Sequence, residues 1–399
     1  MSDPIGSFVP SRSAALDRLA LFAPRAGRAY ETGRNTDPGL DAKSAVSQLS
    51  PYVRYRLITE REIVATVLAR HSLAEAEKYV QEVMWRTYWK GWLEMRPAVW
   101  TRFVLERDLQ SATFPNARAL AAAETGTTGI DGFDDWAREL VATGYLHNHA
   151  HMWFASIWIF TLRLPWVLGA DFFLRHLIDA DAASNTLSWR WVAGLQTVGK
   201  TYLATAENIA RYTNGRFAPV GLATDAISLT EPPVEAAVDL PRTAPPCDEP
   251  SLLLVTHDDF DPGSAVNHPG KVAAALVVAD DSLLWGERAR AFVTAAARDT
   301  ASRVTPAFGC PTAIAARLDA DTLIANARVA GLRQIMTSYA PVGPVADALR
   351  AIGPQLAPEA IALVPVQRRW DVQCWPHAKK GYFAFKTRIP ELLREEGLQ

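Results

Sequence analysis

Three histidines, His147, His149 and His151, stand at alternate positions of one short segment, although the whole chain has only eight histidines. On a helix, His147 and His151 would be one turn apart and could reach a common metal ion, whereas His149 would face another direction. No HExxH motif and no nearby cysteine offers a third ligand. We therefore expect no metal site here, and we interpret the histidines as polar, packed or pocket-lining side chains.

A second set of polar side chains lies in the segment LIDADAASNTLSWRWVAG, residues 177–194, which contains Asp179, Asp181 and Asn185. Unpaired carboxylates and amides lose hydration when they are buried, so these side chains require a polar partner if they lie in a helix. A bound polar ligand is one interpretation. A solvated loop between helices is the other, and the spacing alone does not decide between them.

Two further segments contain residues that suit a ligand. In SQLSPY, Ser47 and Ser50 precede Pro51 at an expected helix start, where hydroxyls and free backbone amides can bind a phosphate or simply cap the helix. In YVQEVMWRTYWKGW, helical spacing brings Glu82, Trp85 and Arg86 near one face, which is typical either of a cleft wall or of packed core.

The elements that must position these residues are mainly helices. Between residues 60 and 220, apolar residues recur every three or four positions, which predicts a run of helices. Six prolines in residues 230–250 predict an extended linker. Beyond the linker, short apolar runs at 252–256, 273–280, 334–339 and 360–366 alternate with helical segments, which is typical of a parallel α/β sheet.

Composition narrows the class of protein. The net charge of −2 and 49% hydrophobic content fit a soluble globular protein, and they neither support nor exclude DNA binding. Three widely spaced cysteines argue against a disulfide framework or a four-cysteine iron–sulfur cluster. We see no signal peptide and no apolar run of transmembrane length, so we expect a cytoplasmic protein with no membrane partner.

Taken together, the segments resemble the helical FAD-binding domain of the photolyase and cryptochrome family. The blocks SQLSPYVRYRLITEREIV, VMWRTYW, TGYLHNHAHMWFASIW, LPWVLGADFF and LIDADAASNTLSWRW follow one another in the family's order, and the likeness covers roughly residues 8–220. The implied fold class is an all-helical FAD-binding domain, residues 1–229, then a proline-rich linker, 230–250, then a Rossmann-like parallel α/β domain, 251–399. The last of these looks like a divergent antenna domain, which the family normally places first.

The resemblance implies FAD as cofactor and leaves any antenna chromophore unidentified. Asn185 matches the residue that faces flavin N5, where it would tune the cofactor's protonation and redox state. Trp189 and Trp166 match the proximal and middle members of the family's electron-transfer chain. The usual distal tryptophan is missing, so Trp100, Trp153 or Trp158 would have to replace it. The residues implied to hold FAD are Tyr30, Ser47, Gln48, Leu49, Ser50, Tyr79, Arg86, His151, Asp179, Ala180, Asp181 and Asn185.

On the substrate side, the resemblance implies a pocket for a pyrimidine dimer flipped out of DNA, with Glu82 as a catalytic hydrogen-bonding group. Two positions depart from the family pattern, because His149 and His151 stand where arginines are expected, the second of which pairs with an acid kept here as Asp179. Histidine lacks the permanent charge and the bidentate donors of arginine. The residues implied to contact substrate are Arg34, Glu82, Trp85, Asn148, His149, Met152 and Trp191.

The functional expectation is a blue-light-driven deoxyribodipyrimidine photo-lyase, a carbon–carbon lyase whose partner is DNA carrying pyrimidine dimers. The alternative is a cryptochrome-like photoreceptor without repair activity that acts on a signalling protein partner. A degenerate redox enzyme or a structural protein is the third hypothesis. The segment after Trp191 lacks the family's proline-rich DNA-contacting loop, which weighs against repair.

Overall fold

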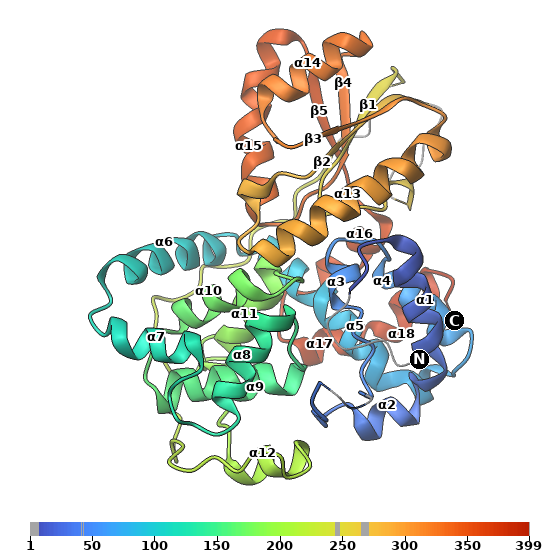
Figure 1. Cartoon of the computed structure of the whole chain (residues 1–399). Coiled ribbons are helices and arrows are strands. Elements are labelled where there is room, and N and C mark those ends of the chain that lie inside the picture. The colour runs from blue at the N-terminus through green and yellow to red at the C-terminus, as the bar shows by residue number, and fades with distance from the viewer. Residues whose placement is uncertain (1–7, 41, 43, 244–247, 265–270, 399) are drawn as a thin grey trace.

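A helical region and a five-stranded α/β unit make up the chain in the computed structural model, which describes residues 8–40, 42, 44–243, 248–264 and 271–398. The α/β unit sits on one side of the helical region, as Figure 1 shows, and the helical region spreads beneath it in two groups of helices. This arrangement confirms the expected fold class of a helical domain followed by a parallel α/β domain.

Helices α1 to α12 form the first region, and the long helix α5 lies at its centre. Thr59 and Ser72 begin α4 and α5 with capping boxes, in which each side chain and the glutamate three residues later satisfy free backbone amides. Gly144 ends α8 in the left-handed conformation that glycine adopts without strain. The bounds are α1 Arg12–Phe22, α2 Arg28–Gly33, α3 Ser50–Arg54, α4 Glu60–Leu68, α5 Leu73–Glu94, α6 Ala98–Thr113, α7 Ala117–Thr125, α8 Phe133–Thr143, α9 Asn148–Ser156, α10 Trp166–His176, α11 Ala182–Val192 and α12 Ala206–Tyr212.

The α/β unit contains a parallel sheet with strand order β3-β2-β1-β4-β5. The four predicted apolar runs are the strands β1, β2, β4 and β5, and the central strands β1 and β4 are buried along their whole length. Strand β3 was not predicted, because it is a short edge strand of small, partly exposed residues. The bounds are β1 Ser251–Val255, β2 Val272–Val278, α13 Glu287–Phe308, β3 Thr312–Ala315, α14 Ala320–Ala330, β4 Gln334–Ser338, α15 Pro344–Leu356 and β5 Ala362–Val366.

After β5 the chain returns to the helical region. Helices α16 (Arg369–Cys374), α17 (Tyr382–Lys386) and α18 (Ile389–Glu395) lie among the N-terminal helices in Figure 1. Trp375 packs so closely on α5 that a methyl group at Gly91 would lie 2.8 Å from its ring, so only glycine fits at this position. The expected α/β region 251–399 therefore includes terminal helices that pack against the helical region.

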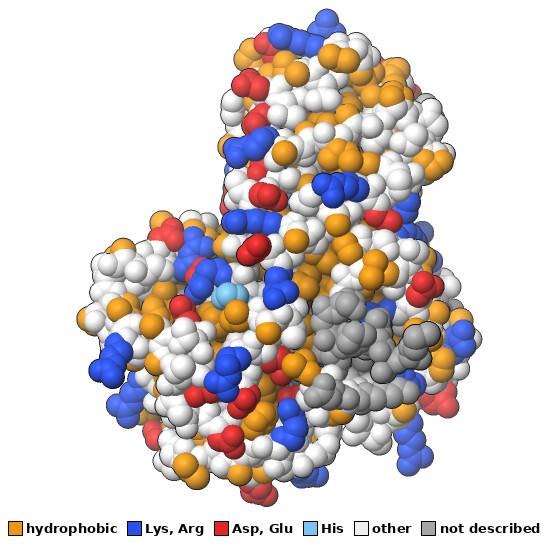
Figure 2. Space-filling model, viewed as in Figure 1, with side chains coloured by type: hydrophobic (Ala, Val, Ile, Leu, Met, Phe, Trp, Pro, Cys, Tyr) orange, Lys and Arg blue, Asp and Glu red, His pale blue; other side chains and the backbone are white. Residues whose placement is uncertain are grey.

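The carboxyl ends of the strands meet the helical region. The loop after β1 places Asp258 against Arg54 and Asp259 against Arg56, while Tyr339, which follows β4, donates its hydroxyl to Glu94 at 2.7 Å. On the face seen in Figure 2, basic and acidic side chains are mixed across both units. None of the described helices combines the length and the apolar character that crossing a membrane requires.

Candidate functional site

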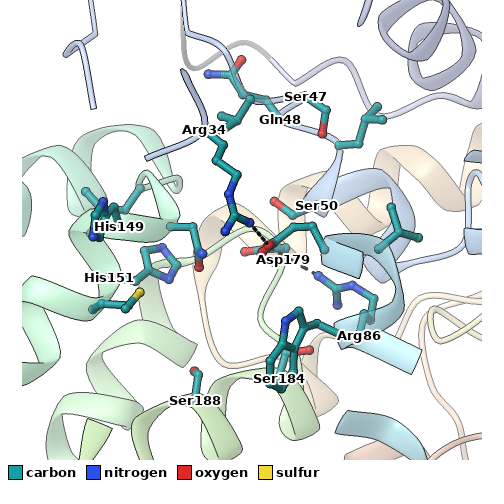
Figure 3. Close-up of a pocket in the computed structure, with 18 of the residues that line it drawn as sticks. Arg34, Ser47, Gln48, Ser50, Arg86, His149, His151, Asp179, Ser184 and Ser188 are labelled. Atoms are coloured by element: carbon teal, nitrogen blue, oxygen red, sulfur yellow. Dashed lines mark hydrogen bonds and ion pairs between the residues drawn. The ribbon is translucent and has the colours of Figure 1, made fainter. Parts of the chain in front are cut away.

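A cavity of about 640 Å³ opens in the helical region between α2, α5, α9, α11 and the loop before α3. Figure 3 shows that side chains from different segments converge on this cavity, among them Arg34, Ser50, Arg86 and Asp179. The side chains of His149 and His151 occupy one wall. Of the predicted site residues, the cavity is lined by Tyr30, Arg34, Ser47, Gln48, Leu49, Ser50, Tyr79, Glu82, Trp85, Arg86, Asn148, His149, His151, Met152, Asp179, Asp181 and Asn185.

Four predicted residues lie outside this lining. Ala180 and Trp189 are buried behind the wall, and Trp166 lines a separate hollow on α10. Trp191 is not part of the lining, but it stacks on Tyr202, which lines the cavity, with ring centroids 5.7 Å apart. A residue two positions beyond Trp189 faces another side of α11, so the helix does not bring Trp189 and Trp191 to one surface.

Asp181 is the electrostatic centre of the cavity floor. Its carboxylate lies 3.4 Å from Arg86, 3.4 Å from Lys90 and 3.5 Å from Arg54, and it accepts a hydrogen bond from the Ser184 amide at the start of α11. Burial alone would raise the pKa of Asp181, but Lys90, Arg54 and Arg86 hold this pKa far below its usual range. The floor therefore carries a permanent negative charge surrounded by cations.

Several buried polar atoms at the cavity have no hydrogen-bond partner within the described residues. They are Nη1 of Arg86, Nε2 of His151 and Oγ of Ser184, and all three residues line the cavity. Buried polar atoms are normally satisfied, so unsatisfied atoms around one large cavity indicate a polar ligand. A flavin ring, with its carbonyl and nitrogen edges, fits such a set.

The loop before α3 offers a second polar wall. Ser47, Gln48 and Ser50 line the cavity, and Gln48 adopts a left-handed backbone conformation with φ 53°. The Gln48 side chain accepts a hydrogen bond of 3.0 Å from Arg18, which holds the turn. Hydroxyls and backbone amides before a helix start suit the phosphates of a dinucleotide.

Asn185 has one side-chain orientation fixed by the fold. Its Nδ2 donates to the Ala170 carbonyl oxygen at 2.8 Å, and the residue is 7% exposed where it lines the cavity. Because the amide group is used in this bond, the carboxamide oxygen remains free to accept a hydrogen bond from a ligand. This geometry fits the flavin-facing position implied by the resemblance.

The three histidines are held apart by different contacts. His147 caps α9 by accepting the His149 amide, His149 stacks on Trp153 at 4.4 Å, and His151 packs edge-on against Phe173. No group of three His, Cys, Asp or Glu side chains within the described part of the chain could hold a metal ion. Asp179 has the Arg86 guanidinium at 3.9 Å.

Acid pH should destabilise the fold through His147. Burial lowers the pKa of this side chain from 6.5 to about 4, so the unfolded chain binds the proton first and the free energy of unfolding falls as pH drops from 6.5 towards 4. The variant His147→Asn keeps a good helix cap and removes the ionisation. The free energy of unfolding, measured by urea titration, should fall between pH 7 and pH 4.5 in both proteins. We expect this fall to be roughly 1–3 kcal/mol smaller in the variant than in the wild type. Equal losses in both proteins would contradict this assignment.

The implied substrate side of the cavity contains an acid and an aromatic wall. Glu82 lies 3.5 Å from Arg34, and burial raises the pKa of Glu82, an effect that Arg34 partly opposes. Trp85 lines the cavity and has one face stacked on Tyr382 of α17, with ring centroids 3.4 Å apart. The C-terminal helices thus hold the orientation of a pocket tryptophan.

Aromatic rings lead away from the cavity towards the α/β unit. Trp189 contacts Trp158 edge-on at 6.2 Å, and the Trp158 indole donates to the carbonyl of Pro165, beside Trp166. From there the centroid distances are 5.7 Å for Trp166–Phe103, 5.5 Å for Phe103–Trp100 and 5.9 Å for Trp100–Trp285. Of the three candidates for the missing distal tryptophan, Trp100 and Trp158 lie along this series, and Trp153 lies beside His149 instead.

Several lining residues escaped the prediction from sequence. Tyr202, Asn208 and Tyr212 come from the segment that replaces the family's DNA-contacting loop, so no family pattern identified them. Helical spacing could have identified Ser188, which lies one turn beyond Ser184 and two turns beyond Asp181. The remaining lining residues that were not predicted are Asn35, Val46, Val53, Ile63, Val83, Trp89, Tyr145, Leu146, Leu177 and Ser184.

Comparison with known proteins finds a match to a family model. Residues 79–215 match the family described as the FAD binding domain of DNA photolyase. Residues 79–215 of the helical region therefore match an FAD-binding domain of the photolyase type. The cofactor that this family match indicates is FAD.

The chain is similar to curated relatives over part of their length. It is 33% identical over 188 residues to a deoxyribodipyrimidine photo-lyase of Streptomyces griseus, covering 45% of this chain and 40% of the relative. It is 30% identical over 200 residues to one from Synechococcus, covering 46% and 39%. The chain thus matches about two fifths of the length of these relatives.

Two solved structures are also similar. A class III photolyase from Agrobacterium tumefaciens is 27% identical with a TM-score of 0.44, covering 51% of this chain and 43% of that structure. A Synechocystis cryptochrome is 23% identical with a TM-score of 0.45, covering 53% and 45%.

Proposed function

We propose that this protein uses blue light and FAD to split cyclobutane pyrimidine dimers in DNA. The observation that supports this proposal is that two sets of residues, one implied to bind the cofactor and one implied to bind the dimer, line the same cavity. The implied cofactor residues Arg86, Asp179 and Asn185 line the same cavity as the implied dimer residues Glu82 and Trp85.

The chemistry divides between the cofactor and the chain. Reduced FAD, excited by blue light, would supply one electron to the dimer and take it back after the ring has split. Trp85, held by Tyr382, would stack on the flipped bases. Arg34 would lie beside the acid and the dimer, within reach of the DNA backbone.

Glu82 would stabilise the negative charge that the dimer carries after it accepts the electron. Burial raises the pKa of Glu82, which favours the protonated form, and a protonated carboxyl can donate a hydrogen bond to a carbonyl oxygen of the dimer. Asn148 and Met152 line the same part of α9 and would complete the pocket. His149, which is held by the Asn35 carbonyl, would contact the substrate with less charge than an arginine.

Glu82→Gln tests the catalytic role. The amide keeps a donor but is a much weaker acid than a carboxyl, so its hydrogen bond to the charged dimer should be weaker, and we expect dimer splitting per absorbed photon to fall about tenfold. The assay is the loss of dimers from irradiated oligothymidylate under blue light, with DNA binding measured separately. Glu77→Gln on the same helix is the matched control, because Glu77 is partly exposed and absent from the cavity lining. Unchanged splitting by Glu82→Gln would contradict the role.

The second candidate function is a photoreceptor without repair activity. The series of rings from Trp189 to Trp285 favours it, because Trp285 belongs to the α/β unit and is partly exposed. An electron taken from this series on illumination would couple the flavin to the neighbouring unit, where a signalling partner could respond. The photoreceptor function predicts that blue light reduces the bound FAD while the protein leaves pyrimidine dimers intact, and both are measured on the purified protein.

A further inference from the structure

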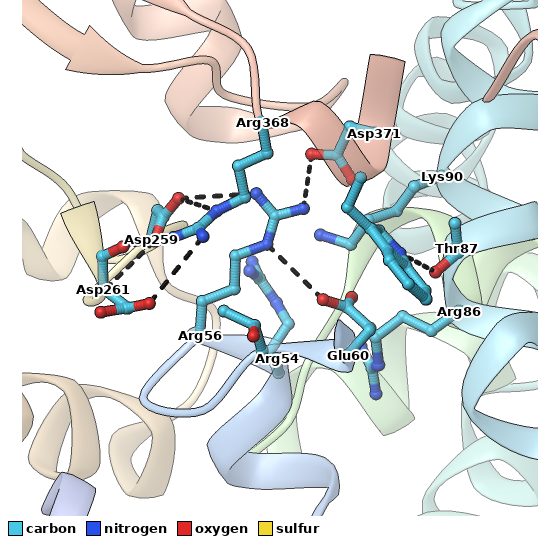
Figure 4. A network of polar contacts seen from close by, with 12 residues as sticks. Arg54, Arg56, Glu60, Arg86, Thr87, Lys90, Asp259, Asp261, Arg368 and Asp371 are labelled. Atoms are coloured by element: carbon cyan, nitrogen blue, oxygen red, sulfur yellow. Dashed lines mark hydrogen bonds and ion pairs between the residues drawn. The ribbon is translucent and has the colours of Figure 1, made fainter. Parts of the chain in front are cut away.

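Residues Arg54, Tyr55 and Arg56, at the end of α3, lie between the cavity floor and the α/β unit. All three side chains are buried, and Figure 4 shows both arginines inside a network of carboxylates and cations. Arg56 adopts a left-handed backbone conformation with φ 50°, which is unfavourable for a non-glycine residue unless its surroundings hold it. A segment this constrained transmits the position of one unit to the other.

On the cavity side, this segment holds the backbone of residues 178–181. The Tyr55 hydroxyl donates to the Ile178 carbonyl at 2.6 Å, and Nε of Arg54 donates to the Ala180 carbonyl at 2.8 Å. Nε of Arg54 also lies 3.5 Å from the Asp181 carboxylate. Arg54 and Tyr55 thus fix the loop segment from which Asp179 and Asp181 reach the cavity.

On the other side, the same residues are held by the loop after β1. Asp258 accepts a hydrogen bond of 2.8 Å from Nη1 of Arg54, and the Phe260 amide donates to the Tyr55 carbonyl at 2.9 Å. Arg56 pairs with Asp371 at 2.7 Å and with Asp259 at 3.5 Å. Ligands commonly bind at the carboxyl ends of strands in parallel sheets. At the carboxyl end of β1, this position is taken by contacts with the helical region.

The charges explain why Asp258 matters to the cavity. Arg54, Arg86 and Lys90 all surround the single carboxylate of Asp181, and Asp258 supplies a second carboxylate to Arg54. Arg54 and Asp258 are each less than one tenth exposed, so neither charge can be satisfied by solvent. Without Asp258, Arg54 would shift towards Asp181 or towards water, and the backbone at Ala180 would move with it.

We propose that Asp258 is a positioning residue for the FAD site, so that cofactor binding and docking of the α/β unit are energetically coupled. The inference rests on the proposed location of FAD. Coupling of two binding events is reciprocal, so FAD should tighten the docking contact by the same factor by which docking tightens FAD binding. The α/β unit is then a structural component of the cofactor site.

The experiment uses the full-length chain with Asp258→Asn, Asp258→Glu and the exposed control Asp281→Asn. We expect Asp258→Asn to weaken FAD binding at least about tenfold in fluorescence titrations of folded apoprotein, the glutamate variant to restore part of it, and the control to bind as the wild type does. The second readout is hydrogen exchange at the Phe260 amide, which bonds across the interface. FAD should slow this exchange in the wild type and much less in Asp258→Asn.

The outcomes separate the two claims. A wild type that binds FAD while Asp258→Asn binds it equally well would overturn the coupling and leave the proposed function intact. Exchange at Phe260 that FAD does not change in the wild type would overturn it as well. A folded wild type that fails to bind FAD would overturn both the cavity assignment and the coupling.

Discussion

Arg86→Ala should purify with little or no FAD. The Arg86 guanidinium carries a buried donor without a hydrogen-bond partner and reaches both aspartates of the cavity floor, at 3.4 Å from Asp181 and 3.9 Å from Asp179. Its removal deletes a ligand contact and leaves Asp179 buried without its nearest cation. Losing one buried charged contact costs about 2–5 kcal/mol, so the dissociation constant for FAD should rise at least about thirtyfold.

The measurement is the ratio of flavin to protein absorbance after purification, followed by titration with FAD. Arg86→Lys keeps the charge but loses the planar fork, so its affinity should lie between those of wild type and alanine variant. Arg118→Ala, on an exposed face of α7, is the control and should bind FAD normally. An alanine variant with full FAD content would show that Arg86 does not contact the cofactor.

Trp189→Phe should remove most of the light-driven reduction of bound FAD. Trp189 is buried behind the cavity wall and lies one helical turn after Asn185 on α11. Its ring centroid is 6.2 Å from that of Trp158. Phenylalanine fills nearly the same space but is much harder to oxidise than an indole. We expect the initial rate of flavin bleaching under blue light, with a thiol reductant present, to fall at least about tenfold.

Trp100→Phe tests the outer part of the series of aromatic rings that begins at Trp189. Trp100 donates its indole N–H to the Asp347 carboxylate at 3.3 Å, which favours loss of an electron from this ring. If electrons reach Trp189 through Trp285 and Trp100, the variant should slow bleaching severalfold while FAD content stays normal. Trp92→Phe, whose ring lies under Arg96 and outside this series, should bleach as the wild type does.

Much of the fold could be predicted from sequence because local signals agree with the packing. Hydrophobic periodicity identified α4, α5 and α8, and four apolar runs identified the buried strands. Contacts between distant segments left no such signal. Trp375 fits against Gly91, and Tyr382 stacks on Trp85, yet neither pair has a sequence pattern that reveals its partner.

The candidate site likewise contains residues that sequence motifs predicted and residues that depend on contacts between distant segments. Residues carried by the family blocks, such as Arg86 and Asp181, line one cavity, and their roles stay predictions. Trp191 stacks on Tyr202, a lining residue from a later segment, and no sequence pattern reveals this contact. The role of Asp258 depends on how the α/β unit packs, which composition and periodicity do not specify.

The most direct test of the account is dimer splitting by the purified protein with its flavin reduced. Oligothymidylate containing cyclobutane dimers is mixed with the protein and either kept dark or illuminated with blue light, and the remaining dimers are counted by chromatography. If the protein repairs dimers, they should disappear only in the light, and Glu82→Gln should slow the loss. Flavin-loaded, reduced protein that leaves the dimer count unchanged in the light would contradict repair.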